Sequence, residues 1–134
     1  MEWSLGIGRG EPIRNPSWEQ IHAALLEMDG IHADEVMLQL SGTGNLVVGG
    51  GNDGRYIVVY FPQDRPDDYS GDSLALADAS LSGEDVTLSF EVDSSFPARL
   101  AVSLPLVLQV VEHFYRTGQI PGEDQLPEGV MWEP

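Results

Sequence analysis

Residues 55–61 constrain the fold of this chain more than any other segment. Successive side chains of an extended strand point to opposite faces. One face of this segment carries Tyr56, Val58 and Tyr60, and the other carries Ile57, Val59 and Phe61. A strand that is apolar on both faces typically lies inside a sheet, with cover on each side. The segment therefore predicts the central strand of such a sheet.

Further strands are predicted on both sides of this segment. Residues 36–40 alternate between apolar and polar side chains, which is typical of a half-buried strand, and residues 45–48 follow after a turn. The connection at 49–54 is rich in glycine, asparagine and aspartate, which adopt the positive φ angles of tight turns. Shorter candidate strands are residues 3–7, 73–77, 86–92 and 99–102.

A first helix is predicted before these strands, over residues 16–28. Asn15 is a suitable cap, Pro16 fits the first helical position, and Glu19 places a negative charge near the positive end of the helix. Gly30 is a natural stop. One face of this helix carries the apolar side chains of Trp18, Ile21, Leu25 and Met28.

A second helix is predicted after the strands. Ser103 caps it, Pro105 is tolerated in its first turn, and Gly118 ends it. Its buried stripe consists of Leu104, Val107, Leu108, Val111, Phe114 and Tyr115. The tail at 119–134 holds prolines and glycines and is predicted to be irregular, but its tryptophan predicts that the tail is docked.

The order of helix, antiparallel strands and helix predicts a single α+β domain spanning residues 1–134. We expect an antiparallel meander sheet of about five or six strands, with the N-terminal and the C-terminal helix packed on it. The hydrophobic content of 42% is ordinary for a globular protein and too high for a disordered acidic tail. Trp3 and Trp132, near the two termini, fit either the core or a contact surface.

The charge of the chain bears on its partners rather than on its fold. Twenty-two acidic residues stand against six arginines, with no lysine, which gives a net charge of −16. Such a field repels phosphate backbones and speeds encounters with basic proteins, so direct binding to nucleic acid or to an anionic membrane is disfavoured. The same acidity also suits simple solubility or a salty cell interior. The N-terminal residues lack the pattern of a signal peptide, and we expect a cytoplasmic location.

The motifs of common enzymes and cofactor sites are missing from the sequence. There is no cysteine, and the glycine-rich stretches lack the lysine of a phosphate-binding loop. His22, His32 and His113 do not have the spacing of a helical metal site. The acids of residues 64–72 do not alternate as in an EF-hand calcium loop. We therefore predict no catalytic residue, no metal and no cofactor.

Residues 64–72 are instead the predicted partner-binding loop. An aromatic side chain ringed by charge resembles the hot spots of protein interfaces, and the loop follows the predicted central strand. A solvated acidic loop is the alternative interpretation. The candidate binding residues are Asp64, Asp67, Asp68, Tyr69 and Asp72.

The C-terminal third resembles a known family. A helix that ends in His113-Phe114-Tyr115-Arg116, then Ile120-Pro121 and a tail with Met131-Trp132-Glu133, is similar to bacterial immunity proteins paired with deaminase-type toxins. These include the immunity protein of the double-stranded-DNA cytosine deaminase toxin. For Trp132 and Glu133, the resemblance favours a role in clamping the fold over one in inhibition.

The resemblance implies a cytoplasmic inhibitor that binds a cognate toxin domain and blocks its active site. The acidity of the chain suits a toxin whose nucleic-acid cleft is basic, and we expect a non-enzymatic protein that is a monomer or a weak dimer. The resemblance assigns no contact residues; from the charge of the chain we expect the carboxylates of residues 64–72 to supply part of the inhibiting surface. An acidic secretion chaperone for an effector protein is the alternative, since it shares both the acidity and the α+β composition. A chaperone wraps an extended segment of its partner, whereas an immunity protein caps a folded domain.

Overall fold

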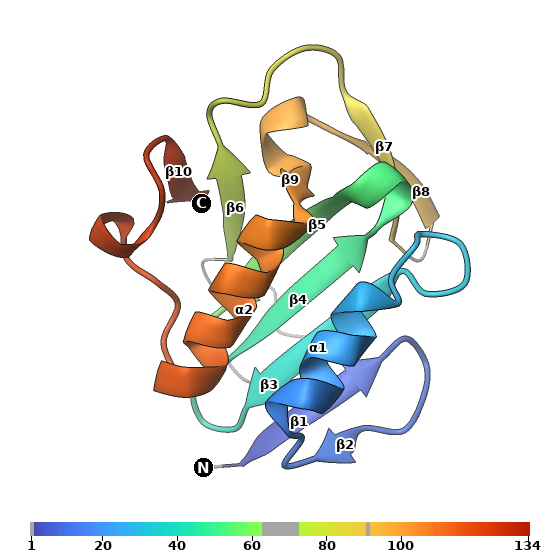
Figure 1. The fold of residues 1–134 in the computed structure, drawn as a ribbon, viewed down its shortest axis with the longest axis vertical. Helices are drawn as coiled ribbons and strands as arrows, with labels where there is room; N and C mark the ends of the chain where they lie inside the picture. Colours follow the sequence, from blue (N-terminus) through green and yellow to red (C-terminus); the bar gives the residue numbers. More distant parts are fainter. Residues whose placement is uncertain (1, 63–72, 91) are drawn as a thin grey trace.

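A computed structural model of the chain describes residues 2–62, 73–90 and 92–134. An antiparallel sheet of eight strands lies behind two helices, α1 (Trp18–Leu26) and α2 (Leu104–Thr117), as Figure 1 shows. A separate hairpin consists of β7 (Val86–Phe90) and β8 (Val92–Phe96). The order along the sheet is β10 (Val130–Glu133), β6 (Leu74–Asp78), β5 (Arg55–Phe61), β4 (Gly44–Gly50), β3 (Glu35–Leu40), β1 (Trp3–Ile7) and β2 (Ile13–Arg14), while β9 (Val102–Ser103) also pairs with β5.

The interior position predicted for β5 is confirmed, and its two faces enter two different cores. Tyr56 and Val58 belong to the main core, which also contains the buried residues of α1 and α2. Ile57 lies on the opposite face and packs with Leu88 of the hairpin and with Ala101. The hairpin therefore covers the face of the sheet that the helices leave open.

The predicted number of about five or six strands was too low. The predicted strand at 86–92 is two strands, because β7 ends at Phe90 and β8 begins at Val92. The segment predicted as a strand at 99–102 is mostly the short helix η2 (Ala98–Leu100), which precedes β9. The tail, predicted to be irregular, contains the short helix η3 (Glu123–Gln125) and the strand β10. Strands of two to four residues carry too little alternation to be recognised from the sequence.

Helix α1 begins later than predicted, and its cap is Ser17 rather than Asn15. The N–H of Gln20 donates to Oγ of Ser17 at 3.2 Å, and the N–H of Ser17 donates to Oε1 of Gln20 at 2.9 Å. Asn15 has a φ of 50° and donates its N–H to the carbonyl of Trp3. Asn15 therefore lies in the turn that follows β2, and the capping box of α1 is formed by Ser17 and Gln20.

Helix α2 has the predicted limits, but its buried stripe differs from the predicted one. Leu106 and Val110 are buried although they were not predicted to be, whereas Leu104, Leu108 and Tyr115 are only half-buried, because the stripe that faces the sheet is rotated around the helix. Ser103 is its N-cap residue, although no hydrogen bond from its side chain caps the helix. Gly118, with a φ of 77°, donates its N–H to the carbonyl of Phe114 at 2.7 Å and ends the helix. The Phe114 ring is fully buried and meets the rings of Trp3 and Tyr60 edge to face, with centroids 5.2 and 5.6 Å away.

The C-terminal tail is docked, as its tryptophan predicts. Nε1 of Trp132 donates to the carbonyl of Pro121 at 3.0 Å, and β10 pairs with β6 along the edge of the sheet. The Arg99 guanidinium donates two hydrogen bonds to Glu133, at 2.9 and 3.1 Å. Trp132 and Glu133 thus hold the tail in place.

Gly49 provides a test of the contact between the sheet and the hairpin. A Cβ atom at this position would overlap the Phe90 ring, although the φ of Gly49 is not in the left-handed region. We expect Gly49→Ala to lower the free energy of unfolding by about 1–3 kcal/mol, the usual cost of overpacking. Urea unfolding at equilibrium measures the change.

Gly6→Ala is the matched control, because Gly6 also lies in a strand but its nearest neighbours are 3.9 Å from the added carbon. Its free energy of unfolding should stay the same or rise slightly. The double variant Gly49→Ala/Phe90→Ala should lose less free energy of unfolding than the two single variants lose together. Strictly additive effects would show that the overlap with Phe90 is not the cause.

Candidate functional site

The five predicted partner-binding residues, Asp64, Asp67, Asp68, Tyr69 and Asp72, lie outside the described residues. The described segments on either side of residues 63–72 lie next to each other, because Tyr60 near the end of β5 pairs with Leu74 at the start of β6. The role of the five residues of the 64–72 loop in binding therefore stays a prediction.

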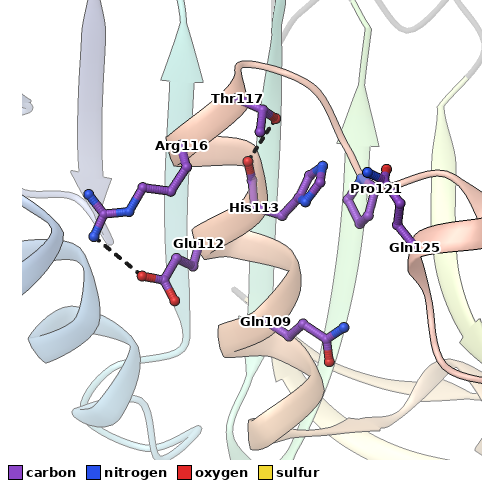
Figure 2. A pocket seen from close by; sticks show the side chains of 7 residues that line it. All are labelled: Gln109, Glu112, His113, Arg116, Thr117, Pro121 and Gln125. Carbon is purple, nitrogen blue, oxygen red and sulfur yellow. Dashed lines mark hydrogen bonds and ion pairs between the residues drawn. The ribbon is translucent and has the colours of Figure 1, made fainter.

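A groove runs along the exposed side of α2, next to the tail (Figure 2). Its first hollow has a volume of about 280 Å³. Arg116 donates to Glu112 at 3.3 Å, and the Thr117 hydroxyl donates to the carbonyl of His113 at 2.8 Å, so these groups are engaged in local contacts. The lining residues are Gln109, Glu112, His113, Arg116, Thr117, Pro121 and Gln125.

A second hollow of about 390 Å³ shares Gln109 with the first and continues toward the start of α2. Asp78 and Glu128 contribute carboxylates to its lining, while Pro105 and Leu106 contribute apolar surface. Neither hollow was predicted from the sequence. The signal was the polar side chains at 109, 112, 113 and 116, whose helical spacing marks a second face of α2 opposite its buried stripe.

Most arginines of the described chain hold the fold together. Arg14 pairs with Glu2 at 2.6 Å, and Arg99 and Arg116 pair with carboxylates as described above. Nε of Arg55 donates to the carbonyl of Ala101 at 2.6 Å. With twenty-two acids in the chain against six arginines, the surface offered to a partner is therefore dominated by negative charge.

The connection between α1 and β3 is a tightly hydrogen-bonded loop. Oδ1 of Asp29 accepts the N–H groups of Ile31, His32 and Ala33 at 2.7–3.2 Å. Oδ2 of Asp29 accepts a hydrogen bond from Nδ1 of His32 at 2.9 Å, and the carbonyl of Ala33 accepts the N–H groups of Asp29 and Gly30. These hydrogen bonds hold the pKa of Asp29 well below its ordinary value of 3.8. The bond with His32 contributes most, and the three backbone N–H donors contribute next. The loop is ordered by its own side chain.

The structure also bears on metal sites and on membrane-spanning helices. Within residues 2–62, 73–90 and 92–134, no group of three or more His, Cys, Asp or Glu side chains is placed to hold a metal ion. In the same part of the chain, no helix is long and apolar enough to cross a membrane.

The comparison with protein families identifies the class of the protein. The sequence model of a family of immunity proteins matches residues 9–134, which is nearly the whole chain. The chain belongs to this family, described as Immunity protein Imm1. Immunity proteins bind a cognate toxin and are generally non-enzymatic, so the chain has a toxin-neutralising role. No curated protein matches the sequence.

The Asp29 loop gives a prediction about pH. Because folding lowers the pKa of Asp29, its stabilising contribution is complete above its ordinary pKa and is lost as the pH falls below it. Asp29→Asn keeps the shape of the side chain but cannot titrate. We expect the difference in free energy of unfolding between the wild type and this variant to be complete above about pH 5 and to shrink below about pH 4.

Urea unfolding at a series of pH values measures this difference. Hydrogen exchange at the amides of Ile31, His32 and Ala33 supplies a local readout and should be faster in Asp29→Asn than in the wild type. A stability difference that is the same at all acidic pH values would show that the carboxylate contributes through its shape alone.

Proposed function

We propose that this immunity protein neutralises a toxin domain that acts on nucleic acid, by covering the basic cleft of that domain with an acidic surface. The net charge of −16 in a member of the Imm1 family carries the proposal. A toxin that binds nucleic acid needs cationic side chains to neutralise phosphates. Carboxylates on a folded inhibitor can occupy the same positions.

Electrostatic steering gives the acidic surface a further advantage. Complementary fields can raise the association rate of two proteins well above the about 10⁵–10⁶ M⁻¹s⁻¹ of a neutral pair. Fast association matters for an inhibitor because an active toxin damages the cell before it is bound. The contacts of Arg14, Arg55, Arg99 and Arg116 within the fold leave this field largely uncompensated.

For the chemistry of the toxin, we propose a deaminase. This part rests on the resemblance of the helix, the tail and Trp132-Glu133 to the immunity proteins of deaminase-type toxins. The structure supports the clamping role that the resemblance implies for these two residues, because Trp132 and Glu133 bind Pro121 and Arg99.

The test is a capture from the native cell with the immobilised chain, followed by washes at about 50 mM and about 500 mM salt. The expected partner is a folded, basic toxin domain that is released by high salt. After purification, this domain should deaminate nucleic acid, and stoichiometric addition of the chain should stop the reaction. Capture of an effector through an unfolded leader segment would instead identify a secretion chaperone, and a toxin of another chemistry would refute the deaminase assignment.

The acidic loop gives a kinetic prediction. Reversing the charge of Asp67 and Asp68 to lysine should slow association with the captured toxin about tenfold at low salt and flatten its salt dependence, because steering follows the local field. Stopped-flow or surface plasmon resonance measurements at several salt concentrations supply the rates.

Glu84 and Asp85 provide the matched control, since they are also adjacent, are exposed, and change the net charge by the same amount when reversed. Their reversal should change the association rate less. Equal effects of both double reversals would mean that only the overall charge matters, which would remove residues 64–72 from the interface.

A further inference from the structure

Three of the exposed large apolar side chains in the described part of the chain belong to segments at one end of the sheet. Among the described residues, the large hydrophobic side chains that remain exposed are Leu26, Ile31, Val92 and Met131. Leu26 is the last residue of α1, Ile31 lies in the α1–β3 loop, and Val92 begins β8. Ile31 and Val92 are the most exposed of the four, at 79% and 69%. Met131 lies apart from them, on the edge strand β10.

A chain of contacts links the loop of Ile31 to the hairpin of Val92. The backbone of Gly30 packs so closely on the Asn52 amide that a Cβ atom at Gly30 would overlap it. Asn52, in η1 (Asn52–Gly54), accepts the N–H of Ser89 at 2.9 Å and donates to its hydroxyl at 3.2 Å. The Ser89 hydroxyl in turn donates to Asp93 at 2.7 Å. Figure 1 shows the α1–β3 loop and the end of the hairpin side by side.

We call the surface formed by residues 26–34, 52–54, 89–90 and 92–93 the Ile31–Val92 face. Its segments contain Glu27, Asp29, Asp34, Asp53 and Asp93 but no arginine or lysine, and its one histidine pairs with Asp29. Apolar side chains surrounded by charge of one sign are typical of the centre and rim of a protein interface.

The loop that carries Ile31 is preorganised for binding. The Asp29 carboxylate and the Ala33 carbonyl fix its backbone, and Gly30 rests on Asn52. A loop whose backbone is held in place before binding loses less conformational entropy on association. Ile31 on this ordered loop is exposed and available for contact with a partner.

We propose that the Ile31–Val92 face docks on the cognate toxin, with Ile31 and Val92 seated on apolar surface and the surrounding carboxylates facing arginines and lysines at the rim of the basic cleft. This inference rests on the proposed function and names the surface of the chain that would contact the toxin. The groove along α2 is less suitable, because Arg116 contributes positive charge there and its lining offers no exposed large apolar side chain.

The Ile31–Val92 face and the loop at 64–72 have different kinetic roles. The loop leaves β5 at the end opposite to η1, and its charges act over a distance, on association. The apolar contacts of the Ile31–Val92 face act only at short range, so they set how long the complex lasts.

The experiment measures dissociation of the toxin domain that the wild-type chain captures, after its identification and purification. Ile31→Ala and Val92→Ala should each raise the dissociation rate about tenfold, with little change in association rate or salt dependence. Val92→Thr, which keeps the shape of the side chain, should have an effect in the same direction. Thermal unfolding should be nearly unchanged, because both side chains are exposed.

Met131→Ala is the matched control, since Met131 is an exposed apolar side chain that lies apart from this face, on the edge strand β10. It should dissociate from the toxin at the wild-type rate. If Ile31→Ala and Val92→Ala also dissociate at the wild-type rate, the docking proposal is overturned while neutralisation by the wild type still stands. If sedimentation shows a wild-type dimer that these substitutions break without affecting toxin binding, the face belongs to self-association. If the wild type neither binds nor protects against a toxin, the proposed function itself fails.

Discussion

The burial of β5 on both of its faces is the constraint on which the rest of the structure depends. Tyr56 and Val58 require one apolar layer, and Ile57 on the reverse face requires another. The two helices supply the first layer, and the β7–β8 hairpin supplies the second. Because a single sheet with one covered face would leave Ile57 in water, the chain needs three layers around this strand.

An aromatic cluster joins the two helices to the first strand. The Phe114 ring lies between Trp3 and Tyr60, while the Tyr115 hydroxyl donates to the carbonyl of Pro16 at 2.8 Å, just before α1. Together with the hydrogen bond of Trp132, these contacts fix both terminal parts of the chain. Loops that leave so firm a scaffold keep their side chains in place, and an inhibitor that must bind quickly benefits from such order.

The charges are divided between structure and recognition. Arg55, Arg99 and Arg116 bind groups of the chain itself, so the few positive side chains serve mainly to fix loops, the tail and a helix. The acids outnumber them and create the field that a basic partner meets. In the proposals made for this member of the Imm1 family, the acidic field attracts the partner from a distance and a small apolar contact holds it once bound.

The sequence alone accounts for the periodic segments. The strands β5 and β3 follow from alternation, the limits of α2 from its capping residues, and the buried face of α1 from helical spacing, because burial on a regular element leaves a regular pattern. Four features required the tertiary structure: the start of α1 at Ser17, the division of 86–96 into two strands, the pairing of β10 with β6, and the gathering of Ile31 and Val92 at one end. Each depends on contacts between residues far apart in the chain. Local periodicity does not encode such contacts. Whether a single isoleucine is exposed depends on how the rest of the chain packs, so it follows from the tertiary structure alone.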